Sequence, residues 1–280
     1  MRNWLYGKTV VLSGASGGIG RELTKILINE YGANVIGLGR SEDKMRSLVE
    51  ELHENAKRFS YHLFDVSKKE NWETLAVELQ TSNISPALLI NNAGAFPSFC
   101  KAQNTPIETA ENILKTNYLA TMYAVNTLSP LLSGNKNDKP AIVNISSSAA
   151  LCTVVGTSAY SASKAALKAY TEALQMEEKG KYIGSIYPGT TKTELFRNDK
   201  NTENSALDLI AMPAQKMAKK IVKKILKKRK RAIVGWDAKL MNLVAKLAPV
   251  KGLALIAWVM KISRSKVFSN VFDYKNKTKE

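Results

Sequence analysis

The chain has 280 residues, of which 45% are hydrophobic, and a formal net charge of +17. This length allows one large globular domain or two small ones. Cys100, Cys152, His53 and His62 are its only cysteines and histidines, which argues against a disulfide framework, a zinc site and a Cys–His nucleophile. No apolar stretch long enough for a signal peptide follows Met1, so we expect a cytoplasmic protein. The few cysteines and histidines lead us to expect no bound metal.

The first predicted strand, Lys8–Leu12, is an apolar and β-branched run typical of a strand buried on both faces. It leads into the glycine-rich turn Ser13–Gly20, and residues 22–28 then have helical spacing. Strand, glycine turn and helix in this order are typical of a site where backbone N–H groups at a helix N-terminus bind a pyrophosphate.

Three glycines of this turn have separate expected roles. Gly14 allows the tight turn, Gly18 lets the backbone approach the phosphates, and Gly20 lets helix and strand pack closely. Their spacing is Gly-x-x-x-Gly-x-Gly, which differs from the Gly-x-Gly-x-x-Gly of the general dinucleotide fingerprint. A turn with a purely structural role is the alternative.

The second predicted strand, residues 34–38, ends at Gly39 and Arg40. An acid near this strand end would bind the ribose 2′-OH of NAD, whereas a guanidinium suits the 2′-phosphate of NADP. Glu42 and Asp43 follow, at positions typical of acids in the first turn of the next helix. Arg40 therefore favours NADP, with NAD as the alternative cofactor and a solvated loop charge as the alternative role.

The rest of the chain alternates between strands and helices. Strands are predicted at 59–64, 87–90, 141–145, 181–187 and 232–235, and helices at 42–55, 69–80, 106–117, 118–132, about 160–178 and 216–231. This order predicts right-handed crossovers and an α/β fold, a doubly wound parallel sheet of about seven strands. We expect a Rossmann domain over 1–235, an amphipathic helical extension over 236–280, and a substrate-covering lid within 194–213.

Tyr160 and Lys164 are four residues apart and therefore share one face of a predicted helix. A phenol ordinarily titrates near pH ~10, and a neighbouring ammonium lowers that pKa, which would make Tyr160 a usable general acid or base. Ser147, just after the strand at 141–145, would hold the reacting oxygen beside it. For an isolated Tyr-x-x-x-Lys, a surface helix is the alternative.

Together these features resemble the short-chain dehydrogenase/reductase family over residues 7–235. The matching motifs are Ser13–Gly20, Asp65, Asn91–Gly94, Asn117, Ser147, Tyr160-x-x-x-Lys164 and Pro188-Gly189. The resemblance implies an NADP-dependent oxidoreductase that interconverts a carbonyl and an alcohol by hydride transfer. Two positions depart from the family pattern: Ser13 stands where Thr is usual, and Gly17 where many NADP-dependent members have a second basic residue.

The resemblance also implies roles for individual residues. Tyr160 would exchange a proton with the substrate oxygen, and Lys164 would lower the pKa of Tyr160 and bind the nicotinamide ribose. Ser147 would orient the substrate, with Ser146 and Ser148 as neighbours. Asn117 would hold a water that links Lys164 to solvent, or else satisfy a helix backbone. The implied catalytic set is Asn117, Ser147, Tyr160 and Lys164.

The implied cofactor contacts are spread over the strand ends. Asp65 would contact the adenine edge, Val66 the ring and Asn92 the ribose, while Thr193, with Thr191 as its competitor, would orient the carboxamide. The full implied set is Gly14, Ser16, Gly18, Ile19, Gly20, Arg40, Asp65, Val66, Asn92, Ala93, Gly94, Tyr160, Lys164, Pro188, Gly189, Thr191 and Thr193.

Nearly all of the basicity lies in the last quarter of the chain. Residues 1–210 have a net charge of +1, whereas residues 211–280 have +16. Basic amphipathic helices with Trp suit an anionic membrane surface, so contact through 216–262 is one expectation. No apolar run approaches the ~20 residues of a membrane span. The region could equally cover the substrate cleft or contact a second subunit, and the lack of an aromatic stacking platform disfavours nucleic acid.

We therefore expect a small-molecule carbonyl or alcohol substrate, lipophilic in character (sterol-like or acyl-chain), and a homodimer or homotetramer. The expected location is cytoplasmic, with peripheral membrane contact as an option. Two alternatives have different chemistry. One is a non-catalytic NADP-binding sensor or scaffold, since a fold does not fix a function. The other is a 3-ketoacyl reductase whose Lys-rich face receives an acidic acyl-carrier protein.

Overall fold

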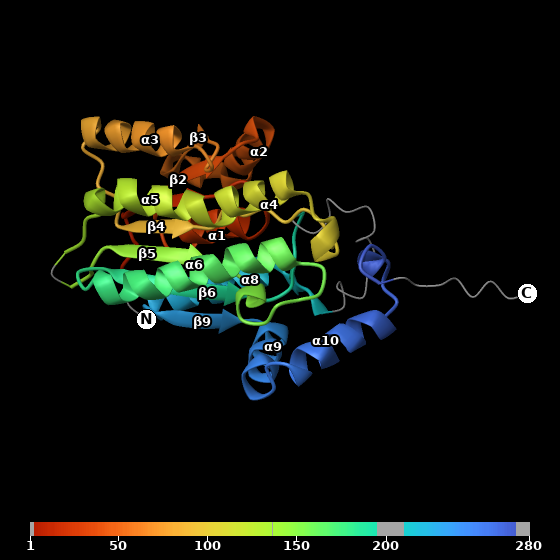
Figure 1. The fold of residues 1–280 in the computed structure, drawn as a ribbon. Coiled ribbons are helices and arrows are strands. Elements are labelled where there is room, and N and C mark those ends of the chain that lie inside the picture. The colour runs from red at the N-terminus through yellow and green to blue at the C-terminus, as the bar shows by residue number, and fades with distance from the viewer. Residues whose placement is uncertain (1–2, 136, 195–209, 273–280) are drawn as a thin grey trace, which may run out of the picture.

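The computed structural model describes residues 3–135, 137–194 and 210–272 (Figure 1). Its centre is a parallel seven-stranded sheet in the order β3-β2-β1-β4-β5-β6-β9. The strands are β1 (Thr9–Ser13), β2 (Asn34–Gly39), β3 (Phe59–Leu63), β4 (Leu88–Asn91), β5 (Ala141–Ile145), β6 (Tyr182–Pro188) and β9 (Arg231–Val234). The predicted doubly wound parallel sheet is confirmed.

Helices cover both faces of this sheet. One face carries α1 (Gly18–Asn29), α2 (Glu42–Leu52) and α8 (Ala214–Leu226). The other carries α3 (Lys69–Thr81), α4 (Ile107–Leu114), α5 (Ala120–Leu128) and α6 (Ser158–Glu177). Short 3₁₀ turns occur at His53–Arg58, Ala102–Asn104, Ser129–Leu131, Ser148–Ala150 and Lys266–Phe268.

The central strands are apolar throughout because both of their faces are buried. In β1, Val10 and Leu12 pack with the helices of the α1 side, whereas Val11 packs with those of the α3 side. Leu88 and Ile90 of β4 alternate with Leu89 in the same way. This alternation divides the core into two layers and holds the strand ends in fixed positions.

Several boundaries differ from the sequence prediction. The helix predicted over 42–55 ends at Leu52, and a 3₁₀ turn follows. The two helices predicted to meet near Asn117 are joined by a π-helical turn, Lys115–Leu119, so the chain continues without a break. Helical spacing alone does not reveal one extra residue in a turn.

The region predicted as a lid, residues 194–213, lies mostly outside the described residues. Two short strands were not predicted: β7 (Thr191–Lys192), which precedes this region, pairs with β8 (Met212–Pro213), at its end. Two-residue strands leave no hydrophobic pattern in a sequence.

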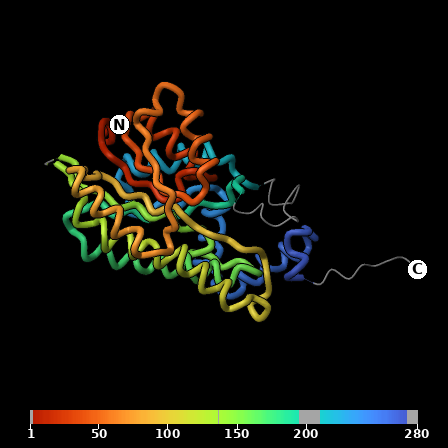
Figure 2. Tube along the Cα trace, turned by 90° about the horizontal axis from the view of Figure 1, so that it is seen from above, coloured from red at the N-terminus to blue at the C-terminus, as the bar shows by residue number. Residues whose placement is uncertain are grey.

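The C-terminal part adds α9 (Trp236–Leu247) beside β9, and α10 (Lys251–Ile262), which packs against α9 (Figure 1). The chain then returns to the carboxyl ends of the strands, where the turn Lys266–Phe268 lies beside the segment that follows β4 (Figures 1 and 2). Within the described ranges, every helix is too short or too polar to cross a membrane.

Candidate active site

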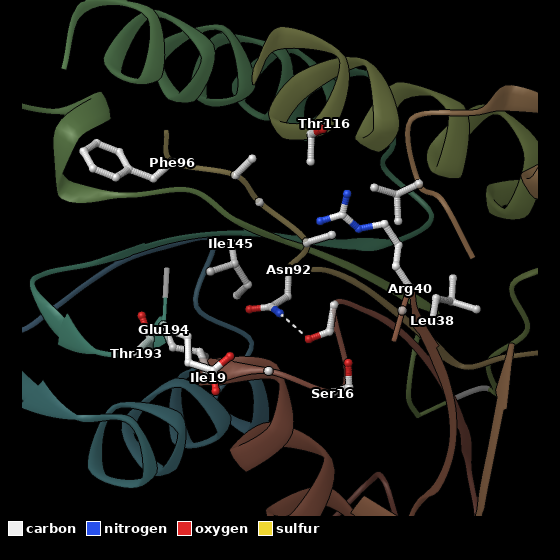
Figure 3. A pocket seen from close by; sticks show the side chains of 18 of the residues that line it. Ser16, Ile19, Leu38, Arg40, Asn92, Phe96, Thr116, Ile145, Thr193 and Glu194 are labelled. Atoms are coloured by element: carbon white, nitrogen blue, oxygen red, sulfur yellow. Dashed lines mark hydrogen bonds between the residues drawn. The ribbon is translucent and has the colours of Figure 1, made fainter. Parts of the chain in front are cut away.

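A cavity of about 450 Å³ lies beyond the carboxyl ends of the strands (Figure 3), where ligands bind on open α/β sheets. It is lined by these residues of the implied sets: Gly14, Ser16, Gly18, Ile19, Arg40, Asp65, Val66, Asn92, Ala93, Gly94, Ser147, Tyr160, Lys164, Pro188, Gly189, Thr191 and Thr193. Gly20 and Asn117 lie behind this lining.

The glycine turn brings helix α1 against β1. Gly14 has φ +68°, a left-handed conformation that favours glycine, and a Cβ there would lie 3.0 Å from the Ala93 Cα. A Cβ on Gly20 would lie only 1.9 Å from the Gly14 carbonyl oxygen. Gly18, with φ +49°, leaves the space that a Cβ would fill next to Thr193. The N-terminus of α1 therefore faces the cavity with exposed backbone donors.

Ser13 joins the ends of β1 and β4. Its hydroxyl accepts hydrogen bonds from the backbone N–H groups of Asn92 (3.0 Å) and Ala93 (3.1 Å). The Asn92 side-chain amide donates to the Ser13 carbonyl at 3.1 Å. Since serine and threonine both supply this hydroxyl, the departure at Ser13 keeps the connection.

The proposed catalytic side chains meet on one wall of the cavity. Tyr160 of α6 is buried and forms a hydrogen bond with Ser147, which follows β5. The Lys164 ammonium lies 5.9 Å from the centre of the Tyr160 ring and 3.5 Å from the Ile145 carbonyl oxygen, to which it donates. Phe96 packs edge-on against Tyr160, with ring centres 5.2 Å apart.

The electrostatics of this wall correct one expectation. Burial raises the pKa of Tyr160 above its ordinary value, and the hydrogen bond with Ser147 lowers it by less. Burial also lowers the pKa of Lys164 to about 8. The expected net lowering of the Tyr160 pKa is therefore wrong for these side chains alone, because desolvation disfavours the phenolate more than the neighbouring groups favour it.

The neighbouring serines have structural partners. The Ser146 hydroxyl is buried and donates to the Lys164 carbonyl at 3.1 Å, which holds the start of α6 against the end of β5. Ser148 is buried in the short turn that follows. Ser147 lines the cavity, and its hydroxyl also accepts a hydrogen bond from the Ala149 N–H at 3.2 Å.

Asn117 braces the loop after β4 from within the π-helical turn. Its side-chain oxygen accepts from the Ala95 N–H at 2.7 Å, and its amide donates to the Ala95 carbonyl and to Ser163, both at 3.0 Å. It therefore satisfies the backbone of this loop. A Cβ on Gly94 would lie 3.2 Å from the Lys164 ammonium and 3.4 Å from the Asn117 oxygen, so all three groups pack closely.

The opposite end of the cavity carries charge. Arg40 points into it (Figure 3), and Lys44 lines it as well and forms an ion pair with Glu194. Burial acts to raise the pKa of Asp65, but hydrogen bonds from Ser67 and the charges of Arg40 and Lys68 outweigh it, so the pKa is lowered. Asp65 is thus an anion at neutral pH.

The two threonines after β6 differ in their partners. The Thr191 hydroxyl donates to the Gly189 carbonyl at 2.9 Å. Thr193 lies directly over Gly18. The hydroxyl of Thr191 is thus tied to the strand end, which favours Thr193 as the contact for a bound ligand.

Further lining residues were not singled out by the sequence: Leu38, Ser41, Lys44, Phe64, Ala95, Phe96, Thr116, Ile145 and Glu194. Lys44 left a signal, since it follows Arg40 by four residues at the start of a predicted helix. Phe96 left only its position two residues after the Asn-Asn-Ala-Gly motif.

An apolar wall stands behind Tyr160 and includes the C-terminal segment. Phe96 packs edge-on against Phe99, and Phe99 against Phe268, each with ring centres 5.0 Å apart. The wall consists of Phe96, Phe99, Ala149, Tyr160, Val267, Phe268 and Val271, all buried.

Comparison with known proteins gives a family match. The family model described as short chain dehydrogenase matches residues 8–204. YxbG, an uncharacterized oxidoreductase of Bacillus subtilis, is 29% identical over 69% of this chain and 70% of its own length. The 3-ketodihydrosphingosine reductase of Bos taurus is 26% identical over 89% of this chain and 78% of its own length. Dehydrogenase/reductase SDR family member 7B of Xenopus tropicalis is 32% identical over 70% of this chain and 64% of its own length.

Solved structures share the fold. A short chain dehydrogenase from Shigella flexneri complexed with NADP aligns with a TM-score of 0.73 and 25% identity, over 83% of this chain and 99% of that one. One from Burkholderia cenocepacia in complex with NADP has a TM-score of 0.74 and 23% identity, over 90% and 98%. A 4-hydroxyisoleucine dehydrogenase complexed with NADH has a TM-score of 0.70 and 24% identity, over 83% and 99%.

Proposed function

Because it matches the family model over residues 8–204, this chain belongs to the short chain dehydrogenase family, and we propose that it is an NADP(H)-dependent oxidoreductase interconverting a carbonyl and an alcohol. The observation that carries this proposal is the meeting of Ser147, Tyr160 and Lys164 on one wall of the cavity. The glycine turn on another wall supports a dinucleotide in the same cavity, because its backbone donors and missing Cβ atoms suit a pyrophosphate.

A bound nicotinamide would supply the hydride, and the protein's groups would supply the proton and the orientation. The hydroxyls of Ser147 and Tyr160 lie within hydrogen-bonding distance of each other. If a substrate oxygen replaced this mutual bond, each hydroxyl could donate its one proton to that oxygen. The raised pKa of Tyr160 keeps its phenol protonated, as a proton donor in carbonyl reduction requires. Asn117 supports these groups by fixing the loop at Ala95.

We propose NADP as the preferred cofactor. Arg40 and Lys44 both line the end of the cavity next to β2, where a ribose 2′-phosphate would lie in this fold. Position 17 is a glycine where many NADP-dependent relatives have a second basic residue. Lys44 of the next helix could take that role by exchanging its ion pair with Glu194 for the phosphate. Of the three solved structures compared above, two contain NADP and one contains NADH.

We propose a lipophilic carbonyl or alcohol as substrate. The apolar wall at Phe96, Phe99 and Phe268 lies next to Tyr160 and favours an apolar group there. Relatives named 3-ketodihydrosphingosine reductase are consistent with a ketone of this kind. A protein-bound acyl chain is the second candidate, favoured only by the Lys-rich exposed face of α8.

The proposed location is cytoplasmic, with peripheral contact between the basic C-terminal region and an anionic membrane. The charge of +16 over residues 211–280 supports this contact. The apolar face of α8 would take no part in this membrane contact, because Met217, Ile221 and Ile225 are fully buried in the core. A homodimer or homotetramer is proposed on the basis of the family resemblance.

The deciding experiment removes one oxygen atom from the site. We expect Tyr160→Phe to lose turnover by about 10²–10⁴-fold, because the proton donor is lost, while NADPH binding stays unchanged. NADPH absorbance with a panel of ketones and aldehydes, including 3-ketodihydrosphingosine, measures turnover, and NADPH fluorescence measures binding. Turnover of Tyr160→Phe at the wild-type rate would refute the assignment. A wild-type chain that binds NADPH but reduces nothing in the panel would favour a sensor or scaffold.

A further inference from the structure

Helix α9 exposes an apolar stripe. Trp236, Leu240, Leu243 and Leu247 follow one another at helical spacing, and each is more than half exposed. A core-facing helix would bury such a stripe, as α8 does. The stripe on α9 thus faces outward although its pattern is that of a buried face.

Helix α10 continues this apolar surface. Leu255, Trp258, Val259 and Ile262 are each about half exposed or more. The two helices cross closely at Gly252, where a Cβ would lie 2.6 Å from a Val244 methyl group. They therefore form one hairpin, which projects from the β9 side of the molecule (Figure 1).

The charge around this hairpin has one sign. The exposed cations are Lys239, Lys246, Lys251, Lys261, Arg264 and Lys266. Between Trp236 and Phe272 the only acid is Asp237. Asp237 is buried and accepts a hydrogen bond from the Thr190 N–H at 2.6 Å, so it adds no negative charge to the surface.

The hairpin is joined to the proposed active site at both ends. At its start, Asp237 holds Thr190 at the end of β6, beside the cavity. At its end, the chain enters the segment 265–272, whose Val267, Phe268 and Val271 pack in the wall behind Tyr160. Gly156 makes room for this segment, since a Cβ there would lie 2.5 Å from a Val271 methyl group.

We propose that the α9–α10 hairpin docks on an anionic membrane and that the site takes a carbonyl substrate dissolved in that membrane. Exposed aliphatic and Trp side chains interleaved with Lys suit the boundary between headgroups and acyl chains. A second copy of this chain is disfavoured as the occupant, because a two-fold contact would bring this cationic face against itself. The substrate part of this inference rests on the proposed function, whereas the docking part does not.

The docking test compares three full-length proteins with phosphatidylcholine vesicles, with and without phosphatidylglycerol, at low salt. They are wild type, the double variant Leu255→Glu/Val259→Glu, and the control Val77→Glu, which changes an exposed residue of α3. Wild type and control are expected to sediment with the anionic vesicles only, and the double variant to bind them at least about tenfold less. The exposed Trp236 and Trp258 should shift their fluorescence to the blue when they enter the apolar layer. Trp4 and Trp72 are already buried, so they should not contribute to this shift.

The substrate test offers one long-chain methyl ketone in anionic vesicles and in neutral detergent micelles, with NADPH oxidation as the readout. The double variant is expected to lose only the rate measured with vesicles. Docking is refuted if the wild-type protein does not sediment with the anionic vesicles, or if the double variant still binds them as well as wild type does. A change in the oligomeric state of the double variant, with vesicle binding unchanged, also refutes docking. Delivery from the membrane is refuted if both rates fall together. No NADPH oxidation by any protein contradicts the proposed function, and vesicle binding still decides docking.

Discussion

Burial sets the protonation states of Tyr160 and Lys164 in opposite senses. It raises the pKa of the phenol, which stays protonated at neutral pH, and lowers the pKa of the lysine to about 8. A proton donor and a lysine that can release its own proton near neutral pH then lie on the same wall. This arrangement suits carbonyl reduction, in which the phenol donates first.

The buried lysine should cost stability. Its pKa falls from 10.5 in the unfolded chain to about 8 in the folded one, so between these values the unfolded state binds more protons and stability rises with pH. We expect Lys164→Met to abolish turnover and to raise the free energy of unfolding at pH 7 by about 1–3 kcal/mol. This gain should shrink as the pH rises above 8.

Urea denaturation at several pH values measures this effect. The control is Lys168→Met on the same helix, which loses a surface ion pair with Glu172 and should change stability by about 1 kcal/mol or less. A Lys164→Met protein less stable than wild type at pH 7 would contradict the burial argument.

Cofactor preference is also decided by single residues. Arg40→Asp replaces a cation lining the cavity by an anion, which would repel a 2′-phosphate. We expect the KM for NADPH to rise at least about tenfold while that for NADH changes little. Arg46→Ala is the control, because Arg46 lies on α2 in an ion pair with Glu42. Equal losses for both cofactors after Arg40→Asp would exclude a role in selectivity.

At the scale of elements, the sites at strand ends could be predicted because each motif is local in sequence. Strands lead into the glycine turn, Asp65 and Asn92, whereas Tyr160 and Lys164 lie four residues apart on one helix. The π-helical turn at Asn117 could not be predicted, because its apolar spacing is that of an ordinary helix.

The packing of α1 on β1 gives a matched pair of variants. Gly20→Ala puts a Cβ 1.9 Å from the Gly14 carbonyl oxygen, so α1 must move away from the strand. Gly17→Ala meets nothing within 4 Å and keeps a negative φ. We expect Gly20→Ala to lose NADPH binding or to fail to fold, and Gly17→Ala to stay within about 1 kcal/mol of wild type.

NADPH fluorescence and circular dichroism separate the two outcomes for Gly20→Ala. Native secondary structure without NADPH binding would locate the damage in the turn. Normal binding by Gly20→Ala would show that the close approach of α1 and β1 is not required.

At the scale of the whole molecule, the C-terminal quarter was the least predictable part. Its charge and apolar spacing fitted a membrane, a lid and a subunit contact equally well. In the structure this stretch has three parts: the apolar face of α8 is buried in the core, α9 and α10 expose their apolar stripes, and residues 265–272 pack in the wall behind Tyr160. The contact between Phe99 and Phe268 joins residues far apart in sequence, so no local sequence pattern predicts it.

This return of the chain places residues 265–272 behind the wall of the cavity that carries Tyr160. Phe268 supports Phe99, which supports Phe96 against Tyr160, while the dinucleotide end of the cavity lies on other elements. We expect Phe268→Ala/Val271→Ala to raise the KM for a lipophilic carbonyl by about tenfold or more and to leave the dissociation constant of NADPH unchanged. Ile107→Ala, which changes an exposed side chain of α4, is the control. If the double variant instead weakens NADPH binding and leaves the KM for the carbonyl unchanged, the segment acts on the cofactor, and its place in the substrate wall is refuted.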